Sequence, residues 1–334
     1  MTRILYLHRD PPFARFIRDD LAILREKYDV DVVHLEKRPM SFVELMRAAT
    51  RADLTYFWWG DVTGVLGVSL ARLLRRPSIM VTGGYDVANV PQIRYGLRYH
   101  PVKRVLPPLA LRLSTRIVAN THFAREGVLK DFHVDPAKIV TIHHGLDATA
   151  IPAPTKPKER RVLTCSLLSK PYIPYKGLDT FVRAARHFPD VPFVHVGLQK
   201  EDGALATLQR IASPNVQFRG FLPEAELLDE MQRAIVYAQL SAHEGFGIAL
   251  AEAMLAGATP AVSRAGAIPE VVGPVGEYAD YGDVDGTAHA IERALATPRP
   301  EAARQRIVEH FSLDKRRCSL HALVEETLAA FRRR

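Results

Sequence analysis

The chain has 334 residues, 47% of them hydrophobic and 25% charged, with a formal net charge of +8; this composition is typical of a globular protein with apolar material for two domains. No apolar stretch reaches the roughly 18 to 20 residues that cross a bilayer, and the short apolar run Ile4–Leu7 predicts no signal peptide. Cys165 and Cys318 have neither a CxxC nor a metal-binding spacing, which favours a reducing, cytoplasmic compartment.

Strand-like apolar runs alternate with helical patterns along the chain, which is typical of parallel α/β architecture. In the first half the predicted strands are Ile4–His8, Val30–Leu35, Leu54–Trp58, Ser78–Thr82, Arg116–Asn120 and Ile139–His143, with helices such as Phe13–Lys27 and Phe42–Ala49. In the second half they are Val162–Leu168, Phe193–Gly197, Val216–Phe221, Ile235–Leu240, Thr259–Ser263 and Val275–Tyr278, followed by an amphipathic helix at about Leu313–Phe331. The three prolines and several charges of residues 151–160 predict a linker between two domains.

Polar and aromatic side chains gather at predicted strand ends in the first half, where a parallel sheet forms its binding edge. The three clusters are His8-Arg9-Asp10, Trp58-Trp59-Gly60-Asp61 and Thr82-Gly83-Gly84-Tyr85-Asp86. Rings beside carboxylates suit sugars, because the C–H faces stack while the acid accepts from hydroxyls. Asp86 or Asp61 would then orient or deprotonate a bound hydroxyl. In the alternative, Trp58 and Tyr85 pack in the core and Asp61 caps the helix that starts at Val62.

The excess positive charge lies in the first half, since residues 1–150 hold 22 Lys+Arg and 15 Asp+Glu whereas residues 151–334 hold 23 and 22. No acid occurs between Asp86 and Glu126, and the segment 87–116 carries Arg94, Arg98, Lys103, Arg104, Arg112 and Arg116. Such a strip attracts anionic lipid head groups or a phosphate-bearing ligand, although a solvated basic face explains it equally well. Nucleic acid is the least favoured partner because no binding motif accompanies the charge. His122, at a predicted helix start, is interpreted as structural.

The most informative run of the second half is Ser241–Gly257, in which Glu244 and Glu252 enclose a Gly-Phe-Gly turn that opens an alanine-rich helix. A glycine turn at a helix N-terminus presents free N–H groups and a positive dipole end, which suits phosphate. Glu244 would repel a phosphate, so it is better placed to accept from hydroxyls attached to it, and Glu252 would accept from a second polyol. Phosphate flanked by two hydroxyl-rich groups describes a nucleotide sugar.

The spacing Glu-x7-Glu within His-Glu-Gly-Phe-Gly-x4-Glu-Ala-Met-Leu-Ala-Gly also resembles the donor-site signature of GT-B glycosyltransferases, specifically the retaining family 4. Lys176-Gly177 is similar to the Lys-Gly element of that family, and Lys170 stands where the family has an arginine, which replaces a bidentate fork with a point charge. Gly220-Phe221-Leu222-Pro223 resembles the family's turn near the nucleobase, and the loop Ser263–Glu270 keeps one glycine, Gly266, of its Gly-Gly-x-x-Glu element. The resemblance covers residues 115–334 by motif and 1–114 by architecture only.

The resemblance implies a GT-B fold, in which two Rossmann-like, doubly wound parallel-sheet domains face a central cleft. Residues 1–150 would form the acceptor-binding domain and residues 151–312 the nucleotide-sugar domain. Residues 313–334 would form a helix that crosses back onto the first domain. The acceptor would be a glycan, a glycolipid or a small polyol, contacted by His8, Arg9, Trp59, Asp61, Gly84 and Tyr85.

The resemblance also implies roles in retaining transfer. Glu244 would hold the hydroxyls of the donor sugar, the amides of Phe246, Gly247 and Ile248 would bind sugar and distal phosphate, and Glu252 would bind the ribose. Lys170 and Lys176 would neutralise the diphosphate, which gains charge as the glycosidic bond breaks. Gly220, Phe221 and Leu222 would lie near the base. No enzyme nucleophile is needed if the leaving phosphate takes the proton of the acceptor. Nothing in the sequence looks like a DxD metal site, so we expect activity without a divalent metal or a cofactor.

Three other functions differ in ways that can be tested. A dinucleotide-dependent dehydrogenase is disfavoured because no predicted strand is followed by GxGxxG. A nucleotide-sugar epimerase of the same architecture would release an isomerised sugar without an acceptor. A non-catalytic nucleotide-sugar-binding scaffold is disfavoured because both glutamates and Lys176 are present together. The nucleobase, the sugar, the acceptor, the linkage and the oligomeric state stay open.

Overall fold

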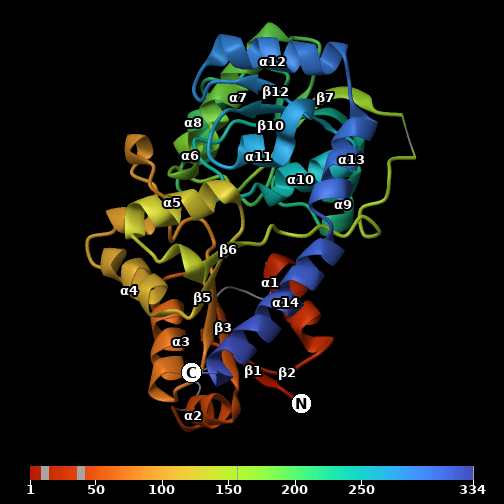
Figure 1. Ribbon diagram of the computed structural model, residues 1–334. Helices are drawn as coiled ribbons and strands as arrows, with labels where there is room; N and C mark the ends of the chain where they lie inside the picture. The colour runs from red at the N-terminus through yellow and green to blue at the C-terminus, as the bar shows by residue number, and fades with distance from the viewer. Residues whose placement is uncertain (9–14, 36–41, 156, 334) are drawn as a thin grey trace. The chain divides into compact units, whose positions relative to one another are not determined.

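The computed structural model describes residues 1–8, 15–35, 42–155 and 157–333. These residues fall into two compact units, one formed by residues 1–145 with 313–334 and the other by residues 146–312 (Figure 1). Every predicted strand is present, within a few residues of its expected bounds. None of the helices in the described ranges combines the length and the apolar character needed to cross a bilayer.

The first unit contains a parallel sheet with the strand order β2-β1-β3-β4-β5-β6. Its strands are β1 (Arg3–His8), β2 (Asp29–His34), β3 (Leu54–Trp58), β4 (Ser78–Val81), β5 (Arg116–Ala119) and β6 (Ile139–Thr141). Its helices are α1 (Arg15–Arg25), α2 (Phe42–Arg51), α3 (Val62–Leu73), α4 (Leu106–Leu113), α5 (His122–Phe132) and α14 (Leu313–Arg332), with short 3-10 turns η1 (Pro91–Ile93), η2 (Leu97–Tyr99), η3 (Lys103–Val105) and η4 (Pro136–Lys138).

The strands of this unit are apolar on both faces because helices cover both sides of the sheet. Alternate residues of β1 point to opposite cores: Leu5 and Leu7 pack with residues of α2 to α5, whereas Ile4 and Tyr6 pack with residues of α1 and α14. Figure 1 shows α1 and α14 together on one side of this sheet and α3 and α4 on the other.

A buried ion pair fastens α14 within this unit. Arg316 on α14 and Asp20 on α1 are 3% and 0% exposed, and they meet through two hydrogen bonds, Nε to Oδ1 at 2.5 Å and Nη2 to Oδ2 at 2.8 Å. Arg316 also donates to the carbonyl oxygen of His143, and the Tyr56 hydroxyl donates to Asp20. Because a buried charge is stable only when it is paired and hydrogen-bonded, this network fixes the position of α14 on the sheet.

The second unit contains a parallel sheet with the order β12-β11-β10-β7-β8-β9. Its strands are β7 (Glu159–Cys165), β8 (Phe193–Val196), β9 (Val216–Phe218), β10 (Ala234–Gln239), β11 (Thr259–Ser263) and β12 (Glu277–Ala279). Its helices are α6 (Tyr172–Lys176), α7 (Leu178–Ala184), α8 (Ala204–Gln209), α9 (Glu224–Arg233), α10 (Ile248–Leu255), α11 (Ile268–Val272), α12 (Val284–Ala296) and α13 (Pro300–His310), with turns η5 (Ala185–His187) and η6 (Gly273–Val275).

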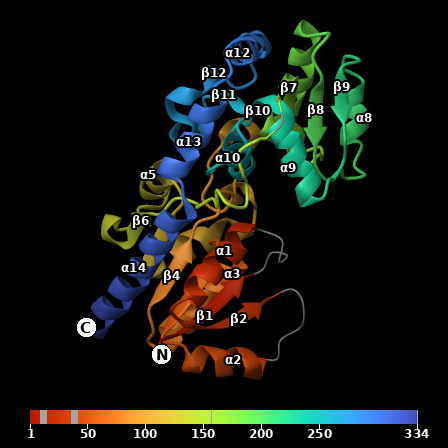
Figure 2. The same cartoon turned by 90° about the vertical axis from the view of Figure 1, so that its right-hand side faces the viewer.

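Helices again cover both faces of this sheet, as Figure 2 shows for α9, α10 and α13 on one side and α12 on the other. Leu163 and Tyr237 pack with α9, α10 and α13, whereas Val162 and Val236 pack with α7, α8 and α12. The break between the units after Gly145 falls a few residues before the predicted linker, and the second break, before Leu313, falls where the terminal helix begins.

Candidate functional site

The loops after β7 and β10 meet through a close backbone contact in the second unit. Gly177, between α6 and α7, has a φ of 62°, and a Cβ there would lie 2.1 Å from the carbonyl oxygen of Leu240. The amide of Ala242 donates to the carbonyl oxygen of Tyr175 at 2.9 Å. Only glycine allows this approach, and its effect is to bring Lys176 beside the residues that follow β10.

Glu244 is the centre of this cluster. It is 7% exposed, and its Oε1 accepts from Lys176 Nζ at 2.6 Å, from Ser241 Oγ at 2.7 Å and from Gln239 Nε2 at 2.9 Å. Within the described residues, all of the hydrogen bonds donated to this carboxylate end on Oε1. The charge is therefore neutralised and oriented through one oxygen, and Oε2 is available as an acceptor for the hydroxyls of a ligand.

Gln239 and Ser241 are functional candidates that sequence reasoning missed. Gln239 Nε2 also donates to Ser241 Oγ at 2.7 Å, so the single hydroxyl proton of Ser241 must point to Glu244. Ser263 in turn donates to the carbonyl oxygen of Ser241 at 2.6 Å. The available signal was a polar pair, Gln239 and Ser241, next to the buried end of an apolar strand.

The glycine turn after Glu244 has the predicted form. Gly247 is the N-cap of α10 with a φ of 90°, and Phe246 is buried against Phe311 with 5.3 Å between the ring centroids. The neighbouring loop also approaches closely: Gly266 has a φ of 58°, and a Cβ there would lie 2.6 Å from backbone atoms of Glu244. The N-terminus of α10 thus starts directly beside the buried carboxylate, where its unsatisfied N–H groups favour an anion.

Glu252 lies on the second turn of α10 and is half-buried. Burial raises the pKa of the Cys165 thiol at the end of β7, and the charge of Glu252 adds to that effect. The predicted contact of Glu252 with a ribose stays a prediction.

Lys170 is exposed on the loop after β7, whereas Lys176 is largely buried and paired with Glu244. Its backbone amide donates to Asp202 Oδ2 at 2.7 Å, and its side chain lies near Gly203 at the start of α8. The ammonium forms no ion pair with another described residue, so it is available to an anion. Its predicted role beside Lys176 stays a prediction.

The predicted base-binding turn lies where β8 and β9 end. The amide of Gly197 donates to the carbonyl oxygen of Gly220 at 2.8 Å, and Phe221 is 71% exposed. Leu222 is partly buried against the core of the unit. An aromatic side chain this exposed at the carboxyl edge of the sheet is available for stacking.

In the first unit, Asp86 binds three backbone amides. Its Oδ2 accepts from Gly60 at 2.9 Å, and its Oδ1 accepts from Gly83 and Gly84 at 3.0 Å each. Burial raises its pKa to about 6, although the hydrogen bonds from the amides of Gly60 and Gly83 act in the opposite direction. The carboxylate holds the ends of β3 and β4 together, so this geometry favours a positioning role over that of an exposed base.

The other candidate residues of the first unit differ in their burial and in their contacts. Trp58 is fully buried and Asp61 accepts from the Thr63 amide at 2.8 Å as the N-cap of α3, as the alternative interpretation held. Tyr85 is 46% exposed, so the alternative that packs it in the core is wrong, and its predicted role in acceptor binding stays a prediction. Trp59 is half-buried with a φ of 65°, and His8 is buried with its ring 4.6 Å from that of His34. Arg9 lies outside the described residues.

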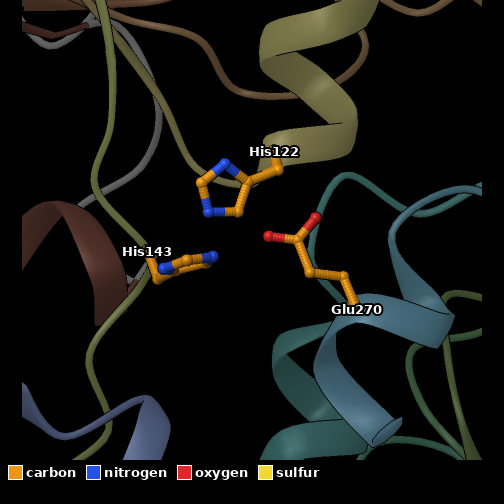
Figure 3. Close-up of side chains that lie close together, drawn as sticks. All are labelled: His122, His143 and Glu270. Carbon is orange, nitrogen blue, oxygen red and sulfur yellow. The ribbon is translucent and has the colours of Figure 1, made fainter.

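His122 and His143 form a pair within the first unit (Figure 3). Their rings are 5.4 Å apart at 70°, and His122 Nδ1 lies 3.3 Å from the Thr141 hydroxyl. The third side chain drawn there, Glu270, belongs to α11 of the other unit. The contact of His122 with β6 agrees with the structural role expected for it.

Residues 153–310 match the family model of glycosyl transferases group 1. MMP alpha-(1->4)-mannosyltransferase of Mycolicibacterium hassiacum is 30% identical over 216 residues, 60% of this chain and 52% of that protein. D-inositol 3-phosphate glycosyltransferase of Mycolicibacterium paratuberculosis is 28% identical over 222 residues, which are 61% of this chain and 49% of that protein. A GDP-mannose-dependent alpha-(1-6)-phosphatidylinositol monomannoside mannosyltransferase of Mycolicibacterium smegmatis is 34% identical over 174 residues, which are 47% of this chain and 44% of that protein. The matches span about half the length of these curated relatives.

Solved structures resemble the whole chain in fold. The Anabaena protein HepE in complex with UDP and glucose has a TM-score of 0.77 at 18% identity, covering 98% of this chain and all of that one. Sucrose-phosphate synthase from Thermosynechococcus elongatus has a TM-score of 0.78 at 15% identity, covering 99% and 100%. The chain has the two Rossmann-like units of the GT-B fold, as predicted. The family match lies within the second of these units.

Proposed function

We propose that the protein is a retaining glycosyltransferase of family 4 that moves a sugar from a nucleoside-diphosphate sugar to an acceptor hydroxyl. The observation that carries the proposal is the convergence of Lys176, the buried carboxylate of Glu244 and the N-terminus of α10 within the segment that matches the family model. A cation and a helix start suit a diphosphate, and a carboxylate with one open oxygen suits the hydroxyls of the transferred sugar.

Each group has a defined task in the proposed reaction. Glu244 Oε2 accepts from the donor sugar, and the amides at the start of α10 bind the phosphate that carries it. Lys176 has three N–H donors, of which one is used on Glu244, so the others are free to meet the charge that develops on the leaving diphosphate. Lys170 adds a second cation, and Glu252 accepts from the ribose. With retention, the leaving phosphate takes the proton of the acceptor hydroxyl, and no enzyme nucleophile is required.

The relatives support a range of substrates. Those named above include enzymes called mannosyltransferases and one called GDP-mannose-dependent, whereas HepE was solved with UDP and glucose. We propose a polyol, a glycan or a glycolipid as acceptor, bound by residues 1–150 with the strand-end clusters that include Trp59 and Gly84. Exposed Phe221 would stack on the base.

A panel of UDP-, GDP- and ADP-sugars tests the proposal. Nucleotide sugars that bind raise the unfolding temperature, and those that do so are assayed for nucleoside diphosphate release with and without acceptors. We expect release that requires Glu244 and Lys176 and yields an anomeric linkage of unchanged configuration. An isomerised sugar formed without acceptor would assign the chain to epimerases, and binding without any turnover would assign it to non-catalytic scaffolds.

We further propose that transfer requires no divalent metal. A metal ion would serve to neutralise the charge of the diphosphate. Lys176 and Lys170 can supply that positive charge instead, and both lie in the same unit as the N-terminus of α10, which would bind the diphosphate. Activity is expected to be equal with EDTA and with added magnesium or manganese. Loss with EDTA and recovery with either metal would refute this part alone.

A further inference from the structure

We propose that residues 101–112 form a docking surface for an anionic lipid bilayer. Three aliphatic side chains protrude there: Val102 is 74% exposed, Val105 is 62% exposed and Leu109 is 43% exposed. Val102 is the N-cap of η3, Val105 is its last residue and Leu109 lies on α4, which follows η3 without a break. We call these three residues the apolar ridge.

The apolar ridge lies opposite the side of α4 that serves the core. Pro107, Ala110 and Leu111 are the buried residues of this helix, whereas the ridge residues recur three and four positions apart, at the spacing of a single helix face. Isolated exposed aliphatic residues are common, but a contiguous row on one face indicates an interaction surface. Folding of the unit does not account for this row.

Unpaired cations flank the ridge. Lys103, Arg104 and Arg112 are exposed, and within the described residues none of their side chains has an ion-pair partner. By contrast, Arg98 is paired with Asp131 and Arg116 with Glu326. Arg94 is also exposed and has no ion pair among the described residues, but it follows η1 and not η3 or α4. The unpaired cations on η3 and α4, which carry the ridge, are therefore Lys103, Arg104 and Arg112.

Charge complementarity selects the occupant. The segment that carries the ridge has no acid between Asp86 and Glu126, so the charges of the segment itself are all positive and attract an anionic surface. Protruding aliphatic side chains enter the boundary between head groups and acyl chains, while lysine and arginine stay at the head groups. An acidic protein partner would use the cations but would have to supply an apolar groove for the ridge, so a bilayer is the simpler occupant.

The test measures co-sedimentation of the purified full chain with vesicles, without donor or acceptor. The vesicles contain phosphatidylcholine alone or mixed with phosphatidylglycerol. One variant carries Lys103→Glu and Arg104→Glu, and another carries Val102→Ser and Val105→Ser. The matched control carries Val43→Ser and Arg47→Glu on α2, where Val43 is 53% exposed and Arg47 is also exposed.

We expect the wild type to bind the anionic vesicles more weakly as salt rises. Each cation near the membrane contributes roughly a factor of five to ten in partitioning, so the charge variant is expected to bind at least about ten-fold more weakly. The serine variant is also expected to lose most binding, and the control is expected to bind like the wild type. All variants change exposed side chains and should keep the wild-type unfolding temperature.

Three results would overturn the inference. One is a wild type that binds neither vesicle, and another is a control variant that loses as much binding as the ridge variants. The third is loss of binding in the charge variant but not in the serine variant, which would describe a general electrostatic face that an acidic protein could equally occupy. None of these results bears on nucleotide-sugar turnover, so the docking surface and the proposed function fail or stand separately.

Discussion

Replacing Ser241 with alanine tests whether the hydrogen bonds on Glu244 Oε1 position that carboxylate for a ligand. The hydroxyl of Ser241 accepts from Gln239 and donates to Oε1 at 2.7 Å, so the variant removes one of three donors from a buried charge. A hydrogen bond to a charged group contributes about 1.5–3 kcal/mol, which corresponds to about ten- to a hundred-fold in an equilibrium constant. We expect a fall in kcat/KM of about ten-fold, because Lys176 and Gln239 continue to hold the oxygen.

The readout that separates positioning from general damage is the difference between two ligands. A nucleoside diphosphate lacks the sugar hydroxyls that Glu244 is proposed to hold, so Ser241→Ala should leave its affinity unchanged while weakening the nucleotide sugar. Ser241→Thr keeps the hydroxyl and should recover most activity. Ser263→Ala is the matched control, because Ser263 donates to the carbonyl oxygen of Ser241 and does not contact the carboxylate.

A double-mutant cycle supplies the refuting result. If Ser241 acts only through Glu244, then Ser241→Ala should change kcat/KM little in a Glu244→Ala background, within the few tenths of a kcal/mol at which independent effects add. A full ten-fold loss in that background would show that Ser241 acts by another route. An equal loss of affinity for diphosphate and nucleotide sugar would refute the proposed contact of Glu244 with the sugar.

Three further predictions concern charge. Lys176→Met leaves the buried carboxylate of Glu244 without its cation, so we expect loss of turnover and a stability loss of about 1–3 kcal/mol in urea unfolding that Glu244→Gln restores without restoring activity. Asp86 has a pKa of about 6 when folded and 3.8 as its ordinary value, so protonation stabilises the folded state and this stability is lost as the pH rises through 6. Between pH 4 and 6 the wild type should lose about 2 kcal/mol of unfolding free energy relative to Asp86→Asn, and a difference between the two proteins that stays constant or grows would contradict this. Arg316→Met leaves Asp20 buried and unpaired, which should cost about 3–5 kcal/mol, and adding Asp20→Asn should recover part of that loss in the same unfolding assay.

The fold was predictable because buried parallel strands are continuous apolar runs that end at glycine, proline or polar residues. The prediction for β3, Leu54–Trp58, is confirmed without change. The prediction for β7 was displaced toward Leu168, a buried residue beyond the strand whose amide donates to the carbonyl oxygen of Leu198. An apolar pattern marks burial, and it does not distinguish a strand from a buried loop that continues it.

The site was predictable only where its chemistry is local in sequence. The turn from Glu244 to Gly247 and its helix are contiguous, so their juxtaposition follows from the chain itself. Lys176 meets Glu244 through a glycine that permits the approach of two loops, and this contact depends on tertiary structure. Asp86 looked like a base for a hydroxyl, but its side chain turns inward to the amides of Gly83 and Gly84. The nearby glycine pair was a local signal for that arrangement.

The ion pair of Lys176 with Glu244 would allow the proposed diphosphate site to form without an exposed excess of charge. Both side chains are largely buried, at 17% and 9% exposure, and either alone would carry a large desolvation cost. In the proposed reaction the diphosphate takes the two remaining donors of the ammonium, while Gln239 and Ser241 keep hold of Oε1. The carboxylate of Glu244 therefore keeps its orientation when the Lys176 ammonium binds both Glu244 and the diphosphate. As a result, the site needs little reorganisation when the leaving group gains charge.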